Sequence, residues 1–315
     1  MHGTRFPSGD PQADRRAEFA ETLAHLGDAA GAIETLTGAL ELAPGWAAGW
    51  FRLGEYLEAT GDTEAAVTAY NRACAADPAD PLGAGLRRDL LRDVPLADRL
   101  PPAFVELLFD QYAPRFDRAL VDQLGYRGPE QLGQALDRAG IIRVDRALDL
   151  GCGTGLTGAV LRPRSGWLAG IDISAGMLFE AREKELYDRL HQADITALEI
   201  GDSYDLIAAG DVFNYIGALE RTIGWCAGSL TPGGTLVFNV EQGDGPVTLH
   251  EGRRFRHSRA YVTGLLDEAG FARVSCTECT LRHDRGAPVA ALTVLASLPG
   301  STVTYQGDGE SEVPA

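Results

Sequence analysis

The sequence is poor in cysteine, in basic residues and in long apolar runs. Five cysteines in 315 residues, an odd number at irregular spacing, argue against a disulfide framework and are typical of a reducing compartment. No apolar run approaches the roughly 18 residues that a membrane-spanning helix needs. Residues 1–7 lack the apolar stretch of a secretory signal. We therefore expect a cytoplasmic protein that has no membrane partner.

Basic residues are outnumbered by acidic ones, 28 to 45, which gives a formal net charge of −17. A nucleic-acid binder generally needs a basic face that neutralises phosphates. The densest basic cluster consists of Arg253, Arg254 and Arg256, and it is too small to anchor a duplex. The charge balance therefore disfavours DNA and RNA as partners.

The cysteines also give little support to a metal site. Cys276 and Cys279 form a C-x-x-C motif, but no second pair stands at the spacing of a zinc site. Apolar and polar residues alternate around them, as in a strand. We expect no bound metal.

Residues 10–94 contain an internal repeat of 34 residues. The pairs that a shift of this length aligns are Gly27 and Gly61, Asp28 and Asp62, Ala32 and Ala66, and Pro44 and Pro78. Each unit is predicted to be a helix, a Gly-Asp turn, a second helix and a proline stop, followed by a capping helix over residues 81–91. The period and the pattern of small and large residues resemble the tetratricopeptide repeat. The resemblance implies an all-α domain over residues 10–94.

Residues 103–298 follow a different pattern. Prolines at positions 95, 101 and 102 interrupt the helical repeats and indicate a domain boundary. From about residue 145 short apolar strands alternate with helices, which is typical of a parallel sheet covered on both faces. The candidate strands are residues 146–150, 167–172, 190–194, 204–209, 234–240, 272–280 and 288–296, the last two forming a hairpin. The polar, glycine-rich residues 299–315 are expected to be disordered.

A glycine-rich loop follows the first of these strands, in the run Ala-Leu-Asp-Leu-Gly-Cys-Gly-Thr-Gly of residues 147–155. Glycines allow the backbone to turn sharply and to approach a ligand closely. Nicotinamide and flavin enzymes also use such a loop, and a plain strand-to-helix turn is the alternative without a ligand. Here Asp149 stands two positions before Gly151, and its carboxylate would repel a pyrophosphate but attract the ammonium of a methionine moiety. The loop therefore favours S-adenosylmethionine (SAM), which has that ammonium and lacks phosphate.

Acidic residues at the ends of the next two strands extend the predicted site. Asp172 lies 17 residues past Gly155, where the second strand of a doubly wound sheet ends beside the first. Its carboxylate suits the two ribose hydroxyls. Asp194 and Ile195 suit the adenine amine and ring, although an ordinary loop aspartate is the alternative for Asp194. Met177 is equally suited to an adenine contact and to the core.

Together these features resemble the class I SAM-dependent methyltransferases over residues 104–298, with residues 230–234 as the family's turn before the fifth strand. The resemblance implies a Rossmann-like domain with a seven-stranded, mostly parallel sheet. The order of the two parts, with the repeats before this domain, is similar to that of a bacterial group of predicted methyltransferases containing tetratricopeptide repeats. The implied cofactor is SAM, the product S-adenosylhomocysteine (SAH), and residues 109–117 form a lid. The implied cofactor-binding residues are Tyr112 of that lid, Asp149, Gly151, Cys152, Gly153, Gly155, Asp172, Ile173, Met177, Asp194, Ile195 and Gly210.

The acceptor side of the site carries fewer signals. Positioning supplies much of the acceleration in an in-line methyl transfer, and a general base helps where the acceptor must lose a proton. His257 and His250, after the fifth strand, and Tyr215, after the fourth, are the candidate catalytic residues. A solvated or structural role is the alternative for the histidines, and Tyr215 and Tyr261 are equally suited to lining the pocket. The absence of Asn-Pro-Pro-Tyr after the fourth strand argues against amide and nucleobase N-methyltransferases.

Three functions remain open at this point. The leading hypothesis is methyl transfer to O, N or C of a small metabolite or natural-product intermediate, with the repeats roofing the acceptor pocket or forming a homodimer. The second is a protein or peptide methyltransferase whose repeat groove docks the polypeptide, and the third is a SAM-binding scaffold without turnover. The groove presents Glu, Thr and Ala, with Trp46 and Trp50 near one end, rather than rows of Arg, Lys or Asn. We therefore favour the small molecule.

Overall fold

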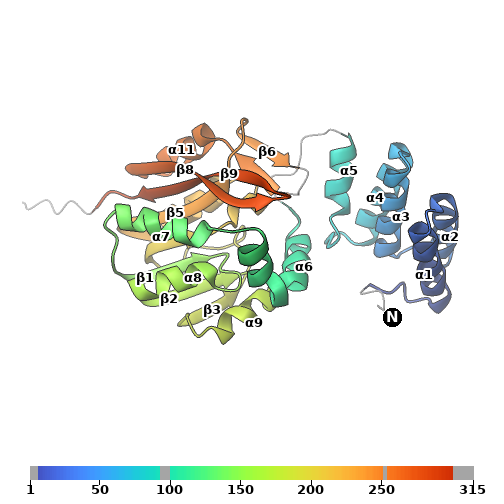
Figure 1. Ribbon diagram of the computed structural model, residues 1–315, viewed down its shortest axis with the longest axis horizontal. Coiled ribbons are helices and arrows are strands. Elements are labelled where there is room, and N and C mark those ends of the chain that lie inside the picture. The colour runs from blue at the N-terminus through green and yellow to red at the C-terminus, as the bar shows by residue number, and fades with distance from the viewer. Residues whose placement is uncertain (1–5, 93–99, 251–253, 301–315) are drawn as a thin grey trace, which may run out of the picture.

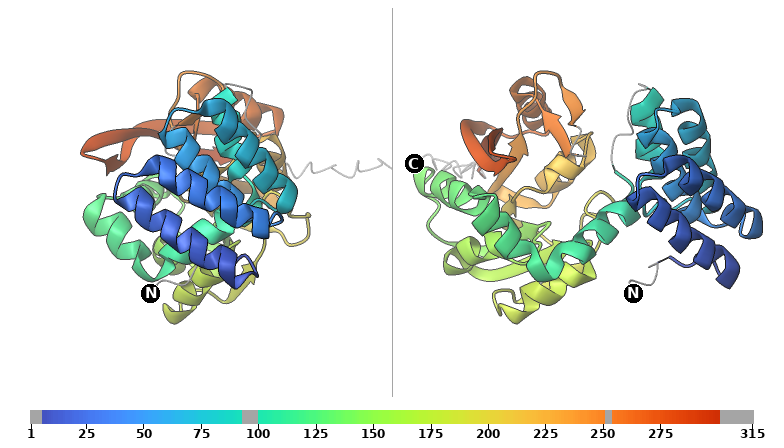
Figure 2. Two further views of the ribbon diagram at one scale, coloured as in Figure 1. Left: turned by 90° about the vertical axis from the view of Figure 1, so that its right-hand side faces the viewer. Right: turned by 45° about the vertical axis from the view of Figure 1, so that its right-hand side comes forward.

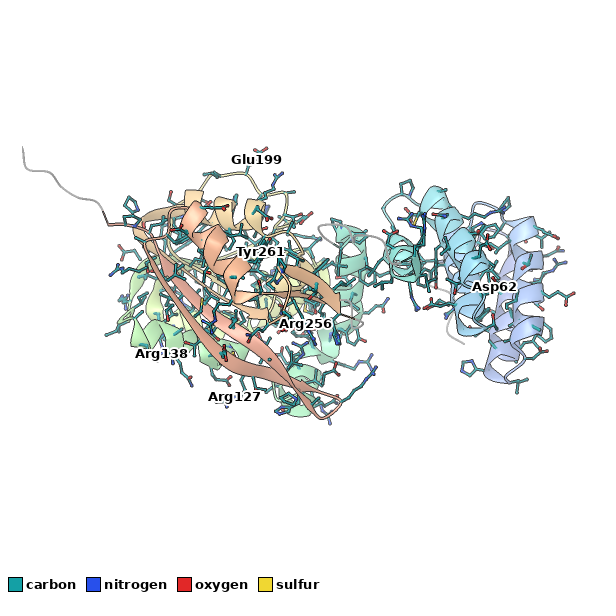
Figure 3. The ribbon with its side chains drawn as sticks, turned by 90° about the horizontal axis from the view of Figure 1, so that it is seen from above. Asp62, Arg127, Arg138, Glu199, Arg256 and Tyr261 are labelled. Atoms are coloured by element: carbon teal, nitrogen blue, oxygen red, sulfur yellow. The ribbon has the colours of Figure 1, made fainter. Side chains whose placement is uncertain are left out.

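The computed structural model describes residues 6–92, 100–250 and 254–300. A helical array occupies the N-terminal side and an α/β part follows it (Figure 1). Seen from above, Asp62 lies in the array, whereas Arg256 and Tyr261 lie in the α/β part (Figure 3). Most of the tail that we expect to be disordered, residues 301–315, falls outside the described residues.

The array is built from antiparallel helix pairs. Its helices are α1 (Pro11–His25), α2 (Ala29–Leu42), α3 (Ala47–Ala59), α4 (Thr63–Ala76) and α5 (Ala84–Arg92). The two Gly-Asp turns have the same structure: Gly27 and Gly61 have φ values of 84° and 83°, and Asp28 and Asp62 each cap the following helix with a side-chain oxygen. The predicted tetratricopeptide repeat is therefore confirmed.

Small residues let the helices of a pair approach closely. A Cβ added to Gly54 of α3 would lie 2.5 Å from the ring of Tyr70 on α4. Tyr70 is fully buried, and its hydroxyl donates to Glu58 at 2.7 Å. Inside such a pair the apolar surface is covered, and the remaining apolar faces meet the neighbouring repeat.

The second part contains one seven-stranded sheet in the order β3-β2-β1-β4-β5-β9-β8. The strands are β1 (Val144–Leu150), β2 (Ser165–Asp172), β3 (Arg189–Gln192), β4 (Tyr204–Ala209), β5 (Leu230–Glu241), β8 (Arg273–Asp284) and β9 (Ala287–Ser297). The first five are parallel, and β9 and β8 form an antiparallel hairpin at one edge. The expected Rossmann-like fold is confirmed.

Helices cover both faces of this sheet, as the alternation of side chains along each strand requires. On one face α7 (Gly128–Arg138) and α8 (Leu156–Leu161) pack over a core that includes Ala147. On the other face α10 (Glu220–Gly228) and α11 (Arg259–Glu268) pack over a core that includes Leu148. None of the helices in the described part of the chain has both the length and the apolarity to cross a membrane.

Three details differ from the expected strands. β5 begins at Leu230, so residues 230–234, expected as a turn before the strand, lie within it. The third strand ends at Gln192, so Asp194 lies in the loop beyond it. The segment after β5 contains a hairpin that the sequence pattern did not predict, formed by β6 (Val247–His250) and β7 (Arg254–His257). Its strands have only four residues each, too few for the pattern of alternation to be recognised.

A small apolar cluster joins the array to the α/β part. Leu86 of α5 packs with Leu100, with Phe104 of α6 (Pro102–Tyr112) and with Phe255 of β7. Figure 2 shows the array beside the α/β part, with α6 leading from one to the other. The array therefore contacts two elements, α6 and the β6–β7 hairpin, that also form walls of the site described next.

Candidate active site

The glycine-rich loop turns the chain sharply between β1 and α8. Gly151, Gly153 and Gly155 have φ values of 69°, 53° and 93°, a region that side chains disfavour. The N–H groups of Gly151 and Cys152 both donate to the carbonyl of Ile171 on β2, at 2.8 and 2.9 Å. A Cβ on Gly151 would lie 2.3 Å from the side chain of Val212. The loop therefore needs glycine and is fixed to the neighbouring strand.

Asp172, the last residue of β2, also holds this loop. Its Oδ2 accepts from the N–H of Gly153 at 2.8 Å, and its Oδ1 accepts from the N–H of Ser174 at 2.9 Å. Burial raises the pKa of Asp172, and these N–H groups partly offset that rise. The carboxylate lies between the loop and the start of α9 (Ala175–Glu183).

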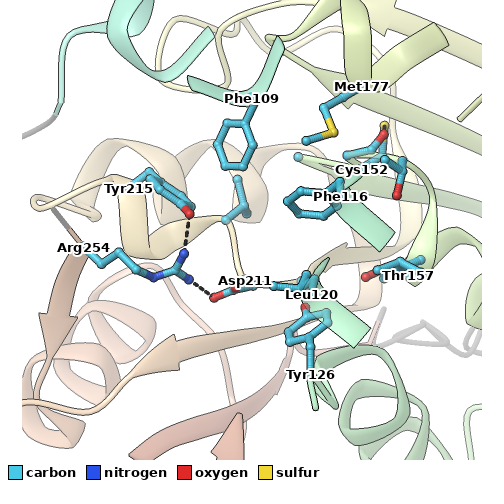
Figure 4. A pocket seen from close by; sticks show the side chains of 16 residues that line it. Phe109, Phe116, Leu120, Tyr126, Cys152, Thr157, Met177, Asp211, Tyr215 and Arg254 are labelled. Atoms are coloured by element: carbon cyan, nitrogen blue, oxygen red, sulfur yellow. Dashed lines mark hydrogen bonds and ion pairs between the residues drawn. The ribbon is translucent and has the colours of Figure 1, made fainter. Parts of the chain in front are cut away.

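Two adjoining cavities lie at the carboxyl ends of the strands, and they share Phe109, Val212 and Tyr215. We call them the glycine-loop cavity and the aspartate cavity. The glycine-loop cavity (Figure 4) is lined by Phe109, Phe116, Leu120, Tyr126, Gly151, Cys152, Gly153, Thr154, Leu156, Thr157, Met177, Gly210, Asp211, Val212, Tyr215 and Arg254. The aspartate cavity is lined by Leu100, Pro102, Val105, Phe109, Asp172, Ile173, Asp194, Ile195, Thr196, Val212, Tyr215 and Ile216.

Most of the residues expected to bind the cofactor line one of these cavities. Gly151, Cys152, Gly153, Met177 and Gly210 line the glycine-loop cavity. Asp172, Ile173, Asp194 and Ile195 line the aspartate cavity. Gly155, at the N-cap of α8, belongs to neither wall. The structure thus brings together residues from the ends of four strands, β1, β2, β3 and β4.

Asp149 lies beneath the loop rather than in a cavity wall. It is fully buried, and its Oδ2 accepts from the hydroxyl of Tyr187 at 2.7 Å. Burial raises its pKa to about 7, an effect that the Tyr187 hydrogen bond opposes. The expected direct contact with an ammonium group is therefore corrected: β1 directs this side chain inward, toward Tyr187.

The lid also differs from the expected one. Tyr112 is 50% exposed and lines neither cavity, because it ends α6 on the outer side. Phe109, about one turn earlier on α6, and Phe116, after the short turn Ala113–Arg115, line the glycine-loop cavity instead. Their rings meet edge to face with centroids 6.1 Å apart.

Two carboxylates attach this lid to the cofactor-side elements. Asp110 Oδ1 accepts from the Ser174 hydroxyl at 2.6 Å and from the Gly176 N–H at 3.1 Å, both at the start of α9. Asp117 accepts from the hydroxyl of Thr154 in the glycine-rich loop and from Lys184 Nζ. The lid is therefore attached on two sides of the cavities.

Neither candidate histidine lines a cavity. His257 is fully buried, with Nε2 2.9 Å from the carbonyl oxygen of Gly217 and its ring stacked on Tyr261. Burial lowers the pKa of His257 and keeps the ring neutral. His250 is exposed on β6. The expected acceptor contacts of both histidines are therefore corrected, because β7 turns His257 into the core and β6 turns His250 outward.

The glycine-loop cavity instead borders a buried ionic cluster that the sequence did not reveal. Arg254 of β7 donates to the hydroxyl of Tyr215, to Asp211 Oδ1 and to Glu241 Oε1. Arg282 Nη2 donates to the same Glu241 oxygen at 2.6 Å. Burial alone would lower the pKa of Arg254, but Asp211, Tyr215 and Glu241 raise it overall. The sequence signal that could have predicted this cluster is the pair of acidic residues Asp211 and Glu241, at the carboxyl ends of the adjacent strands β4 and β5.

The C-x-x-C motif has no place in this site. Cys276 and Cys279 are free cysteines of β8. Residues three apart in a strand point to opposite faces, so the two thiols cannot share a ligand.

The walls fit SAM in their chemistry. Glycines bring the loop backbone close to a ligand, and the carboxylates of Asp172 and Asp194 accept hydrogen bonds from hydroxyl and amine groups. Among the described residues, no lysine or arginine lines the aspartate cavity, whereas a phosphate-bearing cofactor would favour one.

Comparison with known proteins agrees with this fit. A methyltransferase-domain model matches residues 148–238, and a tetratricopeptide-repeat model matches residues 47–87. A dTDP-3-amino-3,4,6-trideoxy-alpha-D-glucopyranose N,N-dimethyltransferase of Streptomyces venezuelae is 30% identical over 176 residues, 50% of this chain and 73% of that protein. A malonyl-[acyl-carrier protein] O-methyltransferase of Enterobacter lignolyticus is 28% identical over 179 residues, 54% of this chain and 69% of that protein.

Solved structures show the same fold. The N-methyltransferase NodS of Bradyrhizobium japonicum, in complex with SAH, superimposes with a TM-score of 0.50 at 20% identity, covering 62% of this chain and 98% of that one. Fold, cavity chemistry and relatives agree. The chain belongs to the class I SAM-dependent methyltransferases and is an enzyme that uses SAM as its methyl donor, with tetratricopeptide repeats before the catalytic fold.

Proposed function

We propose that this enzyme methylates a small metabolite or natural-product intermediate inside the glycine-loop cavity. The observation that carries this proposal is the position of the lid: Phe109 and Phe116 line that cavity, while Asp110 and Asp117 attach the lid to α9 and the glycine-rich loop. A lid attached on two sides favours an acceptor that is enclosed over one that extends along the surface.

The proposed cofactor position follows from the two cavities. When bound, SAM supplies a methyl group activated on a sulfonium. Asp172 accepts from the ribose hydroxyls, Asp194 and Ile195 hold the adenine, and Met177 and the glycine-rich loop contact the rest. Tyr215, shared by both cavities, is then placed at the boundary between cofactor and acceptor.

The names of the relatives include small acceptors and one malonyl group carried on a protein, and they do not select among these. They include an amino-sugar N,N-dimethyltransferase, a malonyl-[acyl-carrier protein] O-methyltransferase and a trans-aconitate 2-methyltransferase of Paracidovorax citrulli, which is 33% identical over 111 residues, 34% of this chain and 43% of that protein. Nitrogen and oxygen acceptors both occur in these names. The acceptor must therefore be inferred from the residues that line the cavity.

The proposed division of the chain is a repeat domain over residues 10–94 and a catalytic domain over residues 103–298. Contact of α5 with α6 and the β6–β7 hairpin supports a role of the repeats in shaping the acceptor side. The free cysteines support a cytoplasmic location.

Incubation with SAM labelled in its methyl group and a cell extract tests this proposal. We expect label in the low-mass fraction, and much less of it with the Asp172→Ala variant. Label found only in protein would favour the peptide-docking alternative. Binding of SAH without any transfer of label would favour the scaffold.

A further inference from the structure

Asp211 has a backbone conformation that side chains rarely adopt. Its φ is 58°, and it directly follows Gly210 at the end of β4, with its side chain only 10% exposed. Residues in this region cost free energy and persist where the surroundings hold them, often at functional sites. Here Asn214 and Arg254 both donate to Asp211 and hold it in the wall of the glycine-loop cavity.

The two oxygens of this carboxylate differ. Oδ1 accepts from Asn214 and Arg254, and Arg282 Nη1 lies 3.7 Å from it. Oδ2 accepts no hydrogen bond from any residue in the described ranges. Asp211 lines the glycine-loop cavity and Oδ2 is not among the fully buried atoms without a partner, so a ligand that donates an N–H or O–H hydrogen bond can reach it.

The four buried charges of the cluster cancel. Two carboxylates, Asp211 and Glu241, face two buried guanidinium groups, Arg254 and Arg282, while Arg256 lies 3.6 Å from Glu241 toward the surface. All three nitrogens of Arg254 already donate to protein groups. Arg254 is therefore poorly suited to hold an acidic acceptor, which would also meet Asp211. The net charge of −17 further favours cationic over anionic ligands at long range.

Aromatic rings form much of the remaining wall. Phe109, Phe116, Tyr126 and Tyr215 surround the cavity (Figure 4). The Phe109 and Tyr215 rings meet edge to face, with centroids 5.0 Å apart. Burial raises the pKa of Tyr215, so its phenol keeps its proton. Ring faces attract organic cations, and a carboxylate beside them adds a hydrogen bond and an opposite charge.

We propose that the methyl acceptor is a small primary or secondary amine whose nitrogen donates an N–H hydrogen bond to Asp211 Oδ2. The nitrogen lone pair forms the new N–C bond while the S–C bond breaks with its electrons on sulfur. The methylated nitrogen is then cationic, and it releases its N–H proton to Asp211 Oδ2. Asp211 is thus a catalytic residue that positions the amine and takes its proton. This inference rests on the proposed methyl transfer to a small molecule.

Trimethylammonium, which resembles the methylated product and carries one N–H, is a direct probe. We expect saturation-transfer NMR titration of the SAH-loaded full chain to show saturable binding of trimethylammonium chloride and none of sodium acetate. Asp211→Asn should weaken this binding at least tenfold. Asp202→Asn removes the same charge at a half-exposed position outside both cavities, and it should retain binding. SAH affinity, measured for all three proteins, separates a lost acceptor site from a lost cofactor site.

Several results would overturn the inference. They are tighter binding of acetate than of trimethylammonium to the wild type, absence of trimethylammonium binding to SAH-loaded wild type, and equal binding by Asp211→Asn. The wild-type comparison decides the matter even if a variant does not fold. Failure of SAH to bind at all would instead contradict the proposed function.

The labelled product from the cell extract gives a second, independent readout. An N-methyl amine is retained on a cation exchanger at pH 7 and keeps its label in mild alkali. A methyl ester releases volatile methanol in alkali, and a methyl ether is neither retained nor hydrolysed. We expect retained, alkali-stable label, and either of the other results would overturn the amine assignment.

Discussion

The carboxylate of Asp172 accepts the backbone N–H of Gly153 at 2.8 Å, and this bond joins the end of β2 to the glycine-rich loop after β1. The other oxygen of the same carboxylate accepts from Ser174, the N-cap of α9. One buried side chain therefore sets the relative position of a loop and a helix start. The hydroxyls of a ribose that binds here would meet a carboxylate already fixed in place.

Replacing Asp172 with alanine should weaken SAH binding by about 1–3 kcal/mol, because both the ligand contact and the loop contact are lost. Calorimetric titration of the folded variant measures this. Asp202→Ala is a suitable control, since Asp202 is a half-exposed partner of Arg146 and Arg189 outside both cavities. Equal affinities of the Asp172 variant and the wild type would contradict the assignment.

Loosening the lid should raise the rate of SAH dissociation more than it lowers the free energy of unfolding. Asp110→Ala removes the two hydrogen bonds that Asp110 accepts from Ser174 and Gly176. We expect at least a several-fold faster SAH dissociation in stopped-flow displacement, and faster hydrogen exchange over residues 102–123.

Glu106→Ala is the matched control for the lid. Glu106 lies on the same helix and accepts a single, longer bond from Gln192, at 3.3 Å. Its dissociation rate should stay near that of the wild type. If both variants release SAH at the wild-type rate, the carboxylate attachments do not hold the lid.

The positions of the residues that we propose for the cofactor side were predictable because local sequence determines them. A glycine-rich loop between a strand and a helix, and acidic residues just past the next two strands, place Gly151, Gly153, Asp172 and Asp194 at one edge of a parallel sheet. The 34-residue repeat likewise predicted the array, since Gly-Asp turns and small residues recur at fixed spacing.

The acceptor side was not predictable, because it depends on contacts between distant segments. Arg254 reaches Asp211 only because β7 of the short β6–β7 hairpin packs against β5 and the turn Phe213–Tyr215. Histidines were favoured by their usual chemistry, yet His257 is directed inward by its place in β7. Side-chain direction in a four-residue strand cannot be inferred without its register.

The buried Asp149 should make the protein less stable as the pH rises. Its native pKa of about 7 lies above the ordinary value of 3.8, so the folded state binds more protons between these values than the unfolded state does. The free energy of unfolding therefore falls through this range as pH increases. Asp149→Asn removes this dependence.

We expect Asp149→Asn to gain stability relative to the wild type between pH 5 and pH 8, on the order of 2 kcal/mol. Urea unfolding of both proteins at the two pH values measures the change. The difference between the free energies of unfolding of the two proteins cancels the contributions of the other titrating groups. A difference that stays constant with pH would mean that Asp149 titrates normally in the folded state.

The repeat array should influence the acceptor site through Leu86. Leu86 of α5 is 8% exposed and packs with Leu100, Phe104 and Phe255. Phe255 directly follows Arg254 in β7, so loss of this packing loosens the hairpin that holds Arg254 against Asp211. Leu86→Ala should cost about 2–5 kcal/mol at this contact and increase the radius of gyration in small-angle scattering as the array separates.

Leu90→Ala controls for the change in helix composition, since Leu90 lies on the same helix but is 41% exposed and outside that cluster. With Leu86→Ala we expect the transfer of label to low-mass acceptors to fall at least several-fold and SAH affinity to fall by less. The Leu86 cluster includes Leu100 of the aspartate cavity, but the proposed cofactor residues Asp172 and Asp194 lie outside that cluster. Leu90→Ala should leave both unchanged. Equal transfer by the two variants would show that the array does not support the acceptor side, and a parallel loss of SAH affinity would place its influence on the cofactor side instead.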